Sequence, residues 1–247
     1  DWSIDDEDES DGDSTVIDDP DAMGDLISDD TSTGIAIIAV NDEGENSIMI
    51  IPGANSLCDN DYFTAHQSEL NDADYVIAQL ETPIDDVYNL LVAAKEAKKV
   101  TILNPAPAPD TIPDLVLSHI DFLTPNETEL AKVAGMPTET IPEITAAAEA
   151  LLQRGVGNVL VTVGSRGALL CNRNGSHLYP AYPQKAVDTT AAGDTFNAAF
   201  AVALAEGWTM DEAIVFANAA AGLSVTRKGA QTSIPCRSEA LMHDSIN

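Results

Sequence analysis

The chain is organised around residues 187–197, which read Val187-Asp188-Thr189-Thr190-Ala191-Ala192-Gly193-Asp194-Thr195-Phe196-Asn197. This pattern predicts a short strand that turns directly into a helix running from Asp194 through Ala205. The small residues Ala191, Ala192 and Gly193 let three consecutive backbone N–H groups point outward where the helix begins. Such N–H groups, together with the positive end of a helix, suit an anion.

Asp194 lies at the rim of the predicted anion site. An aspartate is a poor neighbour for a phosphate, but it is a useful acceptor for the proton of a hydroxyl group, so the residues suggest phosphoryl transfer to an alcohol. The alternative is that Asp194 is a helix N-cap, a position that aspartate often fills for stability alone. On this stretch alone, the two interpretations are equally supported.

The charge of the chain is unevenly distributed. The 247 residues suffice for one sizeable α/β domain, and their formal net charge is −30. Residues 1–31 hold 14 acids and no Lys or Arg, whereas the other 216 residues hold 27 acids and 11 bases. We expect residues 1–31 to be disordered or loosely attached. The acidic balance argues against nucleic acid or an anionic membrane as a partner.

The number and spacing of the cysteines, histidines and apolar residues exclude several classes of protein. The 3 cysteines are odd in number and widely spaced, which predicts no disulfide framework and suits a reducing cytoplasm. The 4 histidines lack the spacing of zinc ligands. No signal segment opens the chain, and no apolar run approaches the length that spans a membrane. Because the first residue is Asp1, we expect the natural chain to start earlier.

The order of the predicted elements indicates an α/β fold. Residues 34–40 and 47–52 read as a hairpin, which on pattern alone fits the edge of a main sheet. A strand at 74–80, a helix at 84–98 and a strand at 100–103 then form a parallel crossover unit. The loops that follow such strands carry ligand sites in open α/β sheets, and Glu81 and Asn104 fall there.

The later part of the sequence continues this alternation of strands and helices. A strand at 120–123 leads into a polar turn, where Asn126 and Glu129 have the spacing of a helix capping box. Strand 158–163 runs into Gly164-Ser165-Arg166-Gly167, which in isolation fits a hairpin turn, and helix 210–225 follows the central stretch. A Walker-type phosphate loop, G-x-x-x-x-G-K-[ST], is absent from the sequence.

Residues 188–194 resemble the D-T-x-G-A-G-D signature of the ribokinase-like sugar kinases, the phosphofructokinase-B type carbohydrate kinase family, with Ala191 in place of the first glycine. Further motifs follow the family's order between residues 32 and 240. They are Asn104-Pro105-Ala106-Pro107, Asn126-x-x-Glu129, Thr162-x-Gly-Ser-Arg-Gly167 and Thr226-Arg-x-Gly-Ala-x-x-Ser-x-Pro235. The resemblance implies a three-layer αβα sandwich with a mainly parallel central sheet over residues 32–247. It also implies a small β lid, formed by the hairpin within residues 33–55.

The resemblance implies an activity as well. The family phosphorylates sugars with ATP, and the matching motifs favour transfer to the primary 5-hydroxyl of D-ribose, giving ribose 5-phosphate at the first step of ribose catabolism. A related fructokinase activity is the nearest alternative. Asp194 matches the catalytic base, the N–H groups of Ala191, Ala192 and Gly193 match the anion hole, and Glu81 matches a glutamate that binds sugar hydroxyl groups.

The resemblance also assigns cofactor sites. ATP contacts fall on Asn126, Thr162, Val163, Gly164, Ser165, Arg166, Gly167, Gly193 and Asn218. Glu129 holds Mg²⁺, partly through water. The resemblance also places a K⁺ cage on Asp188, Thr190 and Ser233 and on the backbone carbonyl oxygens of Ser224, Arg227 and Gly229. Oxygen ligands suit a large, weakly charged ion. The alternative for this last segment is an ordinary glycine-containing loop in which Ser233 makes a turn hydrogen bond.

The sequence departs from the family at its front. The family's N-x-D sugar contact and its G-G-K-G-A-N loop are not found in these 247 residues. Two hypotheses follow: a ribokinase of which this chain is the later part, active when complete, or a short nucleotide-binding remnant without kinase activity. The family's lid strands often clasp two copies together, so a homodimer is a further expectation.

Overall fold

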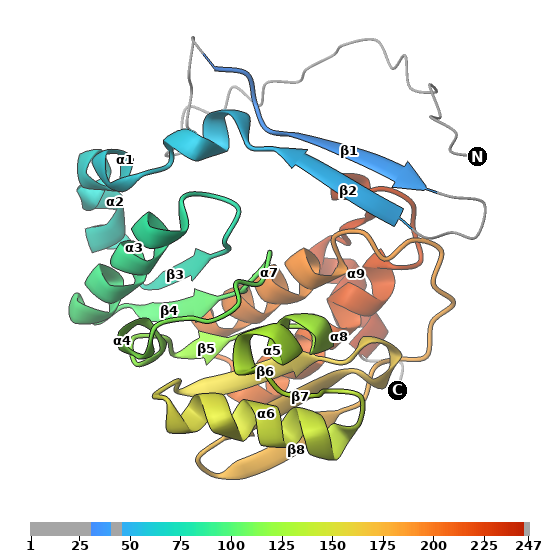
Figure 1. Ribbon diagram of the computed structural model, residues 1–247. Helices are drawn as coiled ribbons and strands as arrows, with labels where there is room; N and C mark the ends of the chain where they lie inside the picture. Colours follow the sequence, from blue (N-terminus) through green and yellow to red (C-terminus); the bar gives the residue numbers. More distant parts are fainter. Residues whose placement is uncertain (1–30, 41–45, 245–247) are drawn as a thin grey trace.

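A six-stranded sheet forms the centre of the computed structural model, which describes residues 31–40 and 46–244 (Figure 1). The expected disorder of the acidic segment concerns residues that lie, apart from residue 31, outside this description. The strand order is β3-β4-β5-β6-β7-β8, with parallel pairing from β3 to β6 and antiparallel pairing of β7 and β8. The strands are β3 (Tyr75–Ala78), β4 (Val100–Leu103), β5 (Phe122–Leu123), β6 (Asn158–Thr162), β7 (Ala168–Asn172) and β8 (Gly175–Tyr179).

Helices cover both faces of this sheet. One face carries α3 (Ile84–Glu96), α4 (Asp114–Leu117), α5 (Glu127–Ala134) and α6 (Ile141–Gln153), and the other carries α7 (Ala192–Ala205), α8 (Met210–Ser224) and α9 (Arg237–Asp244). Successive strand residues point to opposite faces, so Ile102 packs with the α7 side and Leu103 with the α3 side. The three-layer αβα sandwich is therefore confirmed.

The hairpin near the start of the chain stands apart from the main sheet. Among the described residues, strands β1 (Ile35–Val40) and β2 (Asn46–Ile51) pair only with each other, as an antiparallel two-stranded sheet that lies above the main sheet in Figure 1. The interpretation of this hairpin as an edge of the main sheet is therefore wrong. Apolar side chains of the hairpin face solvent, with Met49 65% and Ile50 51% exposed.

Several elements were not predicted from the sequence. Three of them are short helices between the hairpin and β3, namely η1 (Gly53–Leu57), α1 (Asn60–Ala65) and α2 (Gln67–Asp72). The others are α4, β8, α9 and the short 3₁₀ helices η2 (Gly164–Arg166) and η3 (Gln231–Ser233). These segments are short or only weakly amphipathic, so the sequence gives little sign of them. Strand β5 was predicted over residues 120–123 but has only two residues. In the described part of the chain, no helix is long and apolar enough to cross a membrane.

Candidate active site

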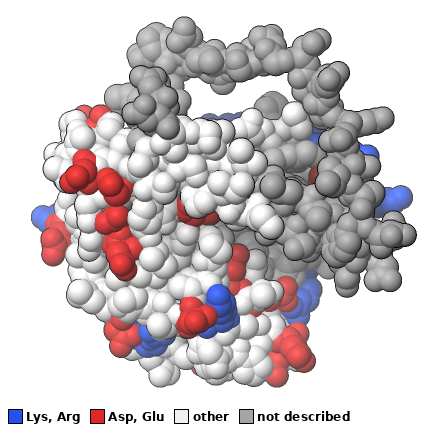
Figure 2. All heavy atoms as spheres, turned by 45° about the horizontal axis from the view of Figure 1, so that its top comes forward, with Lys and Arg blue, Asp and Glu red and all other residues white. Residues whose placement is uncertain are grey.

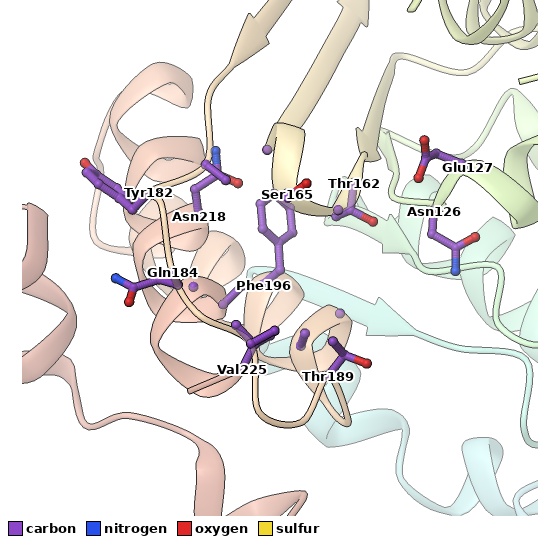
Figure 3. A pocket seen from close by; sticks show the side chains of 18 of the residues that line it. Asn126, Glu127, Thr162, Ser165, Tyr182, Gln184, Thr189, Phe196, Asn218 and Val225 are labelled. Carbon is purple, nitrogen blue, oxygen red and sulfur yellow. The ribbon is translucent and has the colours of Figure 1, made fainter. Parts of the chain in front are cut away.

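Two adjoining cavities open at the carboxyl ends of the parallel strands, which is where open α/β sheets bind ligands. The larger cavity has a volume of about 730 Å³, and the smaller one about 190 Å³. Asn126, Thr162 and Gly193 line both, so the cavities meet at these residues. Figure 3 shows Asn126 and Glu127 on one side of the larger cavity, Tyr182 and Asn218 on the other, and Phe196 between them.

The junction of the two cavities is built by the start of α7. This helix begins at Ala192, two residues before the predicted start, and its N-cap is Ala191 in the left-handed conformation at φ 58°. Asp194 therefore lies in the first turn, and the interpretation of Asp194 as the N-cap is wrong. A left-handed conformation costs a residue with a Cβ roughly 1–2 kcal/mol, and such strain concentrates at functional sites.

The backbone amides at the start of α7 are partly open. The N–H of Ala192 donates to the carbonyl oxygen of Thr189 at a long 3.3 Å, which closes a turn. The N–H groups of Ala191 and Gly193 have no hydrogen-bond partner among the described residues. Gly193 is exposed, and a Cβ added there would meet no atom within 4 Å, so a ligand can approach this backbone closely. Two of the three amides singled out in the sequence are thus available to an anion.

Asp194 is exposed and makes no ion pair with a described residue. Its Oδ1 accepts a hydrogen bond from Nε2 of Gln79 at 2.6 Å, and its Oδ2 has no such partner in the described chain. Gln79 follows β3 directly, and sequence reasoning did not single it out. Its position at the carboxyl end of a parallel strand was the signal that could have identified it.

Asn126 and Glu129 form a capping box at the start of α5. Oδ1 of Asn126 accepts from the backbone N–H of Glu129 at 2.8 Å, while Oε2 and Oε1 of Glu129 accept from the backbone N–H and Nδ2 of Asn126, each at 2.8 Å. Burial raises the pKa of Glu129, and the Asp194 carboxylate raises it further, although hydrogen bonds from Asn126 and Asn104 oppose this. Glu81 lines the same small cavity. Glu81, Glu129 and Asp194 therefore give this cavity an acidic lining.

The connection between β6 and β7 forms one wall of the larger cavity. Thr162, Gly164, Ser165 and Gly167 line it, whereas Val163 is buried in the core and Arg166 pairs with Glu127. Gly167 adopts φ +103°, and a Cβ there would lie 2.0 Å from the carbonyl oxygen of Tyr179. Only glycine fits this crossing, so the wall has a fixed backbone shape.

Much of the lining of the larger cavity is apolar. Tyr182, Pro183, Phe196, Ala221 and Val225 line it together with the backbone of Gly222. Such a slot suits the flat face of a nucleotide base. Asn218, which was expected to contact the nucleotide, donates through Nδ2 to the carbonyl oxygen of Tyr179 at 3.1 Å. Asn218 therefore also holds the end of β8 in place, just before Tyr182 and Pro183 of the cavity lining.

Three residues of the expected K⁺ cage, Asp188, Thr190 and Gly229, are joined by hydrogen bonds. Oδ1 of Asp188 accepts from the backbone N–H and the hydroxyl group of Thr190, at 2.9 and 2.7 Å. Oδ2 accepts from the N–H of Gly229 at 3.0 Å, and these hydrogen bonds lower the pKa of Asp188 to about 2. The Oγ of Ser233 donates to the carbonyl oxygen of Ala230 at 2.7 Å, so the turn bond of the alternative reading is present.

The carbonyl oxygen of Ser224, another expected K⁺ ligand, also accepts a hydrogen bond within the protein. The carbonyl oxygen of Ser224 accepts from the N–H of Arg227 at 3.1 Å, and the guanidinium group of Arg227 pairs with Glu239 at 2.6 Å. Each carbonyl oxygen has a second lone pair, so these hydrogen bonds do not prevent cation binding. In the described part of the chain, no three His, Cys, Asp or Glu side chains lie close enough to enclose a metal ion by themselves.

This sandwich, with paired cavities and an aspartate beside open amides, defines a kinase that phosphorylates an alcohol. The chain belongs to the pfkB family of carbohydrate kinases, whose family model matches residues 21–237. It is 40% identical over 209 residues to the ribokinase of Haemophilus influenzae, covering 85% of this chain and 68% of that protein. It is also 40% identical over 212 residues to the ribokinase of Staphylococcus aureus, covering 85% and 69%.

Solved structures give the same result. The ribokinase of Arabidopsis thaliana complexed with ribose and ATP superposes with a TM-score of 0.80 at 38% identity, over 88% of this chain and 70% of that one. The ribokinase of Thermotoga maritima superposes with a TM-score of 0.77 at 40% identity, over 86% and 70%. The chain thus spans about two thirds of the length of these relatives.

Proposed function

We propose that this chain transfers the γ-phosphoryl group of ATP to the 5-hydroxyl of D-ribose. The observation that carries the proposal is the position of Asp194, one residue after the open N–H of Gly193 and at the meeting point of the two cavities. The relatives named as ribokinases, and the one described with ribose and ATP, support this sugar and this phosphoryl donor.

The small cavity suits the sugar, and the large one suits the nucleotide. Asp194 accepts the proton of the 5-hydroxyl through its free Oδ2 while the hydroxyl oxygen attacks the γ-phosphorus. The bond from this phosphorus to the β,γ-bridging oxygen breaks, ADP departs with that bond's electron pair, and Asp194 later releases the proton to water. The N–H groups of Gly193 and Ala191 and the positive end of α7 stabilise the charge on the transferred group.

The small cavity also fits a divalent cation. Its lining includes the carboxylates of Glu81, Glu129 and Asp194 and contains no Lys, Arg or His. Hard cations such as Mg²⁺ prefer oxygen ligands and retain much of their water, so Glu129 would hold the cation through water. When bound, Mg²⁺ neutralises charge on the phosphate oxygens. ATP-bound relatives support ATP, and one structure that includes Mg²⁺ shares the fold.

A monovalent cation is proposed for the segments joined by Asp188 and Gly229. The ionised Asp188 accepts a hydrogen bond from the N–H of Gly229, so it holds these segments together and adds negative charge beside Gly229. Oxygen ligands and low charge suit K⁺, which would stiffen the backbone before α7 without touching the substrate. Exchanging K⁺ for Na⁺ should lower the rate of turnover, and an unchanged rate would count against this site.

A homodimer through the lid strands is also proposed. The hairpin exposes Ile35, Met49, Ile50 and Ile51, and it packs as a separate two-stranded sheet. Exposed apolar patches of this kind mark protein–protein contacts. Light scattering after size-exclusion chromatography measures the mass, and substitution of Met49 and Ile50 by Ser should give monomers if the lid is the contact.

A turnover assay tests the main proposal. The chain is incubated with D-ribose, ATP, Mg²⁺ and K⁺, and ribose 5-phosphate and ADP are measured. The proposal expects the two products to form in equal amounts. D-fructose in place of D-ribose tests the nearest alternative sugar. ATP binding by calorimetry without turnover of either sugar would contradict the proposal and support a nucleotide-binding protein.

A further inference from the structure

Asn197 is a buried polar residue that the proposed reaction does not yet use. It lies on α7 one turn after Asp194, is 5% exposed, and lines the small cavity. Its Oδ1 is buried without a hydrogen-bond partner among the described residues. A buried acceptor without a partner costs free energy, so the fold retains an unfavourable group at this position. A ligand that donates a hydrogen bond would remove this cost.

The small cavity indicates which kind of ligand this is. Glu81, Glu129 and Asp194 bring three carboxylates to its lining, and no basic side chain balances them. A volume of about 190 Å³ accommodates several water molecules, each of about 30 Å³ in the liquid. The cavity therefore lacks positive charge and has room for a hydrated ion.

We propose that Oδ1 of Asn197 accepts a hydrogen bond from a water molecule of a hydrated divalent cation held in the small cavity. The cation is the one that accompanies ATP, so the inference rests on the proposed function. The carboxylates do not enclose a bare ion, since no three acidic, His or Cys side chains are grouped closely enough among the described residues. Mg²⁺ keeps several waters when proteins bind it, and those waters need acceptors.

Asn197 is thus a positioning residue that acts on the cation through water. Without the cation, its oxygen is an unfavourable buried acceptor, and with the cation the oxygen is satisfied. Replacing Asn197 by Leu, whose side chain has the same number of non-hydrogen atoms and the same branching, removes the acceptor without creating a large cavity. We expect the metal-free Asn197→Leu variant to be as stable as the natural chain or more so, although it binds the cation more weakly.

The experiment measures Mn²⁺ binding by electron paramagnetic resonance, using the full chain with and without ADP. Asn197→Leu should weaken Mn²⁺ binding in the ADP complex about tenfold, the effect of losing one hydrogen bond with a water molecule of the cation. Asn197→Asp should tighten it, because a fourth carboxylate attracts the hydrated ion. Thermal unfolding of the metal-free proteins gives the second measurement.

Asn158→Leu is the matched control. Asn158 lies at the opposite end of β6, where its Nδ2 donates to the carbonyl oxygen of Asp121 at 2.9 Å. Because this amide is satisfied within the protein, its loss should lower the unfolding temperature and leave the Mn²⁺ affinity unchanged.

Three results would overturn the inference. The first is equal Mn²⁺ affinity of Asn197→Leu and the natural chain, including the case in which neither binds the ion. The second is a loss of stability in metal-free Asn197→Leu as large as that of Asn158→Leu, which indicates a structural role. The third is a raised KM for D-ribose at unchanged Mn²⁺ affinity, which assigns Asn197 to a sugar hydroxyl. The proposed function is tested independently, by measuring whether the natural chain phosphorylates ribose.

Discussion

Nε2 of Gln79 donates a hydrogen bond to Oδ1 of Asp194 over a distance of 2.6 Å, although the two residues are 115 positions apart in the chain. Gln79 follows β3, and Asp194 lies in the first turn of α7, so the bond joins the main sheet to the helix that carries the proposed base. One carboxylate oxygen is thereby fixed in direction. The other oxygen is left to receive a proton from a substrate hydroxyl.

Gln79→Leu should lower kcat about tenfold and leave the KM for ATP unchanged. Leu has a similar size but donates no hydrogen bond, so the Asp194 carboxylate loses the group that orients it, and misplacement of a reacting group is costly. Steady-state kinetics at saturating D-ribose measure the effect. An unchanged kcat would show that Asp194 needs no orienting partner.

Asp194→Asn should reduce turnover by a factor of about 10²–10⁴, which is the usual contribution of a general base. The amide keeps the shape of the side chain but cannot accept the hydroxyl proton. ATP affinity, measured by calorimetry, should stay similar because the larger cavity is not altered. Retention of most of the turnover would exclude Asp194 as the base.

Ala191→Gly should raise the free energy of unfolding by about 0.5 kcal/mol. Glycine relieves the strain of the left-handed conformation at φ 58°, and the greater freedom of glycine in the unfolded chain offsets part of this gain. Ala198→Gly, at an exposed position inside the same helix, should instead cost about 1 kcal/mol. Urea unfolding compares the two variants. A loss of stability in Ala191→Gly would contradict the strain argument.

Asp188 should make the stability of the chain dependent on pH in acid. Its hydrogen bonds with Thr190 and Gly229 lower its pKa from 3.8 to about 2 in the folded chain. A lowered pKa means that the stabilisation is fully present above pH 4 and is lost as the pH falls through 2. The difference in unfolding free energy between the natural chain and Asp188→Asn should therefore be constant above pH 4 and shrink below it. A difference that is independent of pH would show that the Asp188 carboxylate contributes nothing through its charge.

Much of the layer structure could be predicted because it follows from local patterns. The apolar runs that became β3, β4 and β6 have the length and flanking turns of buried strands, and the helices between them are strongly periodic. The hairpin of β1 and β2 was recognised, but its separation from the main sheet was not, since pairing partners are set by packing far along the chain. Short helices such as α1 and α2 carry too few residues for a clear period.

The candidate site was predicted less completely. The sequence predicted roles for Asp194 and for the amides at the start of α7, because these residues are consecutive and form a motif. Gln79 and Asn197 were missed, since each is a single amide whose role depends on a distant neighbour or on a cavity. Asn197 did carry one signal: it is a lone polar side chain in a mainly apolar part of α7. The start of α7 was placed two residues late because the left-handed conformation of Ala191 is not evident from an alanine.

The position of β3 at the end of the sheet has a consequence for handling the protein. Its outer side has no strand partner within the described chain, and Ile77 there is 47% exposed. An open strand of this kind is a template on which further copies can add. The net charge of −30 opposes such growth by repulsion, and Figure 2 shows acidic side chains spread over the visible face. Added salt screens that repulsion, so concentrated samples should become turbid as ionic strength rises, and Ile77→Lys should keep them clear.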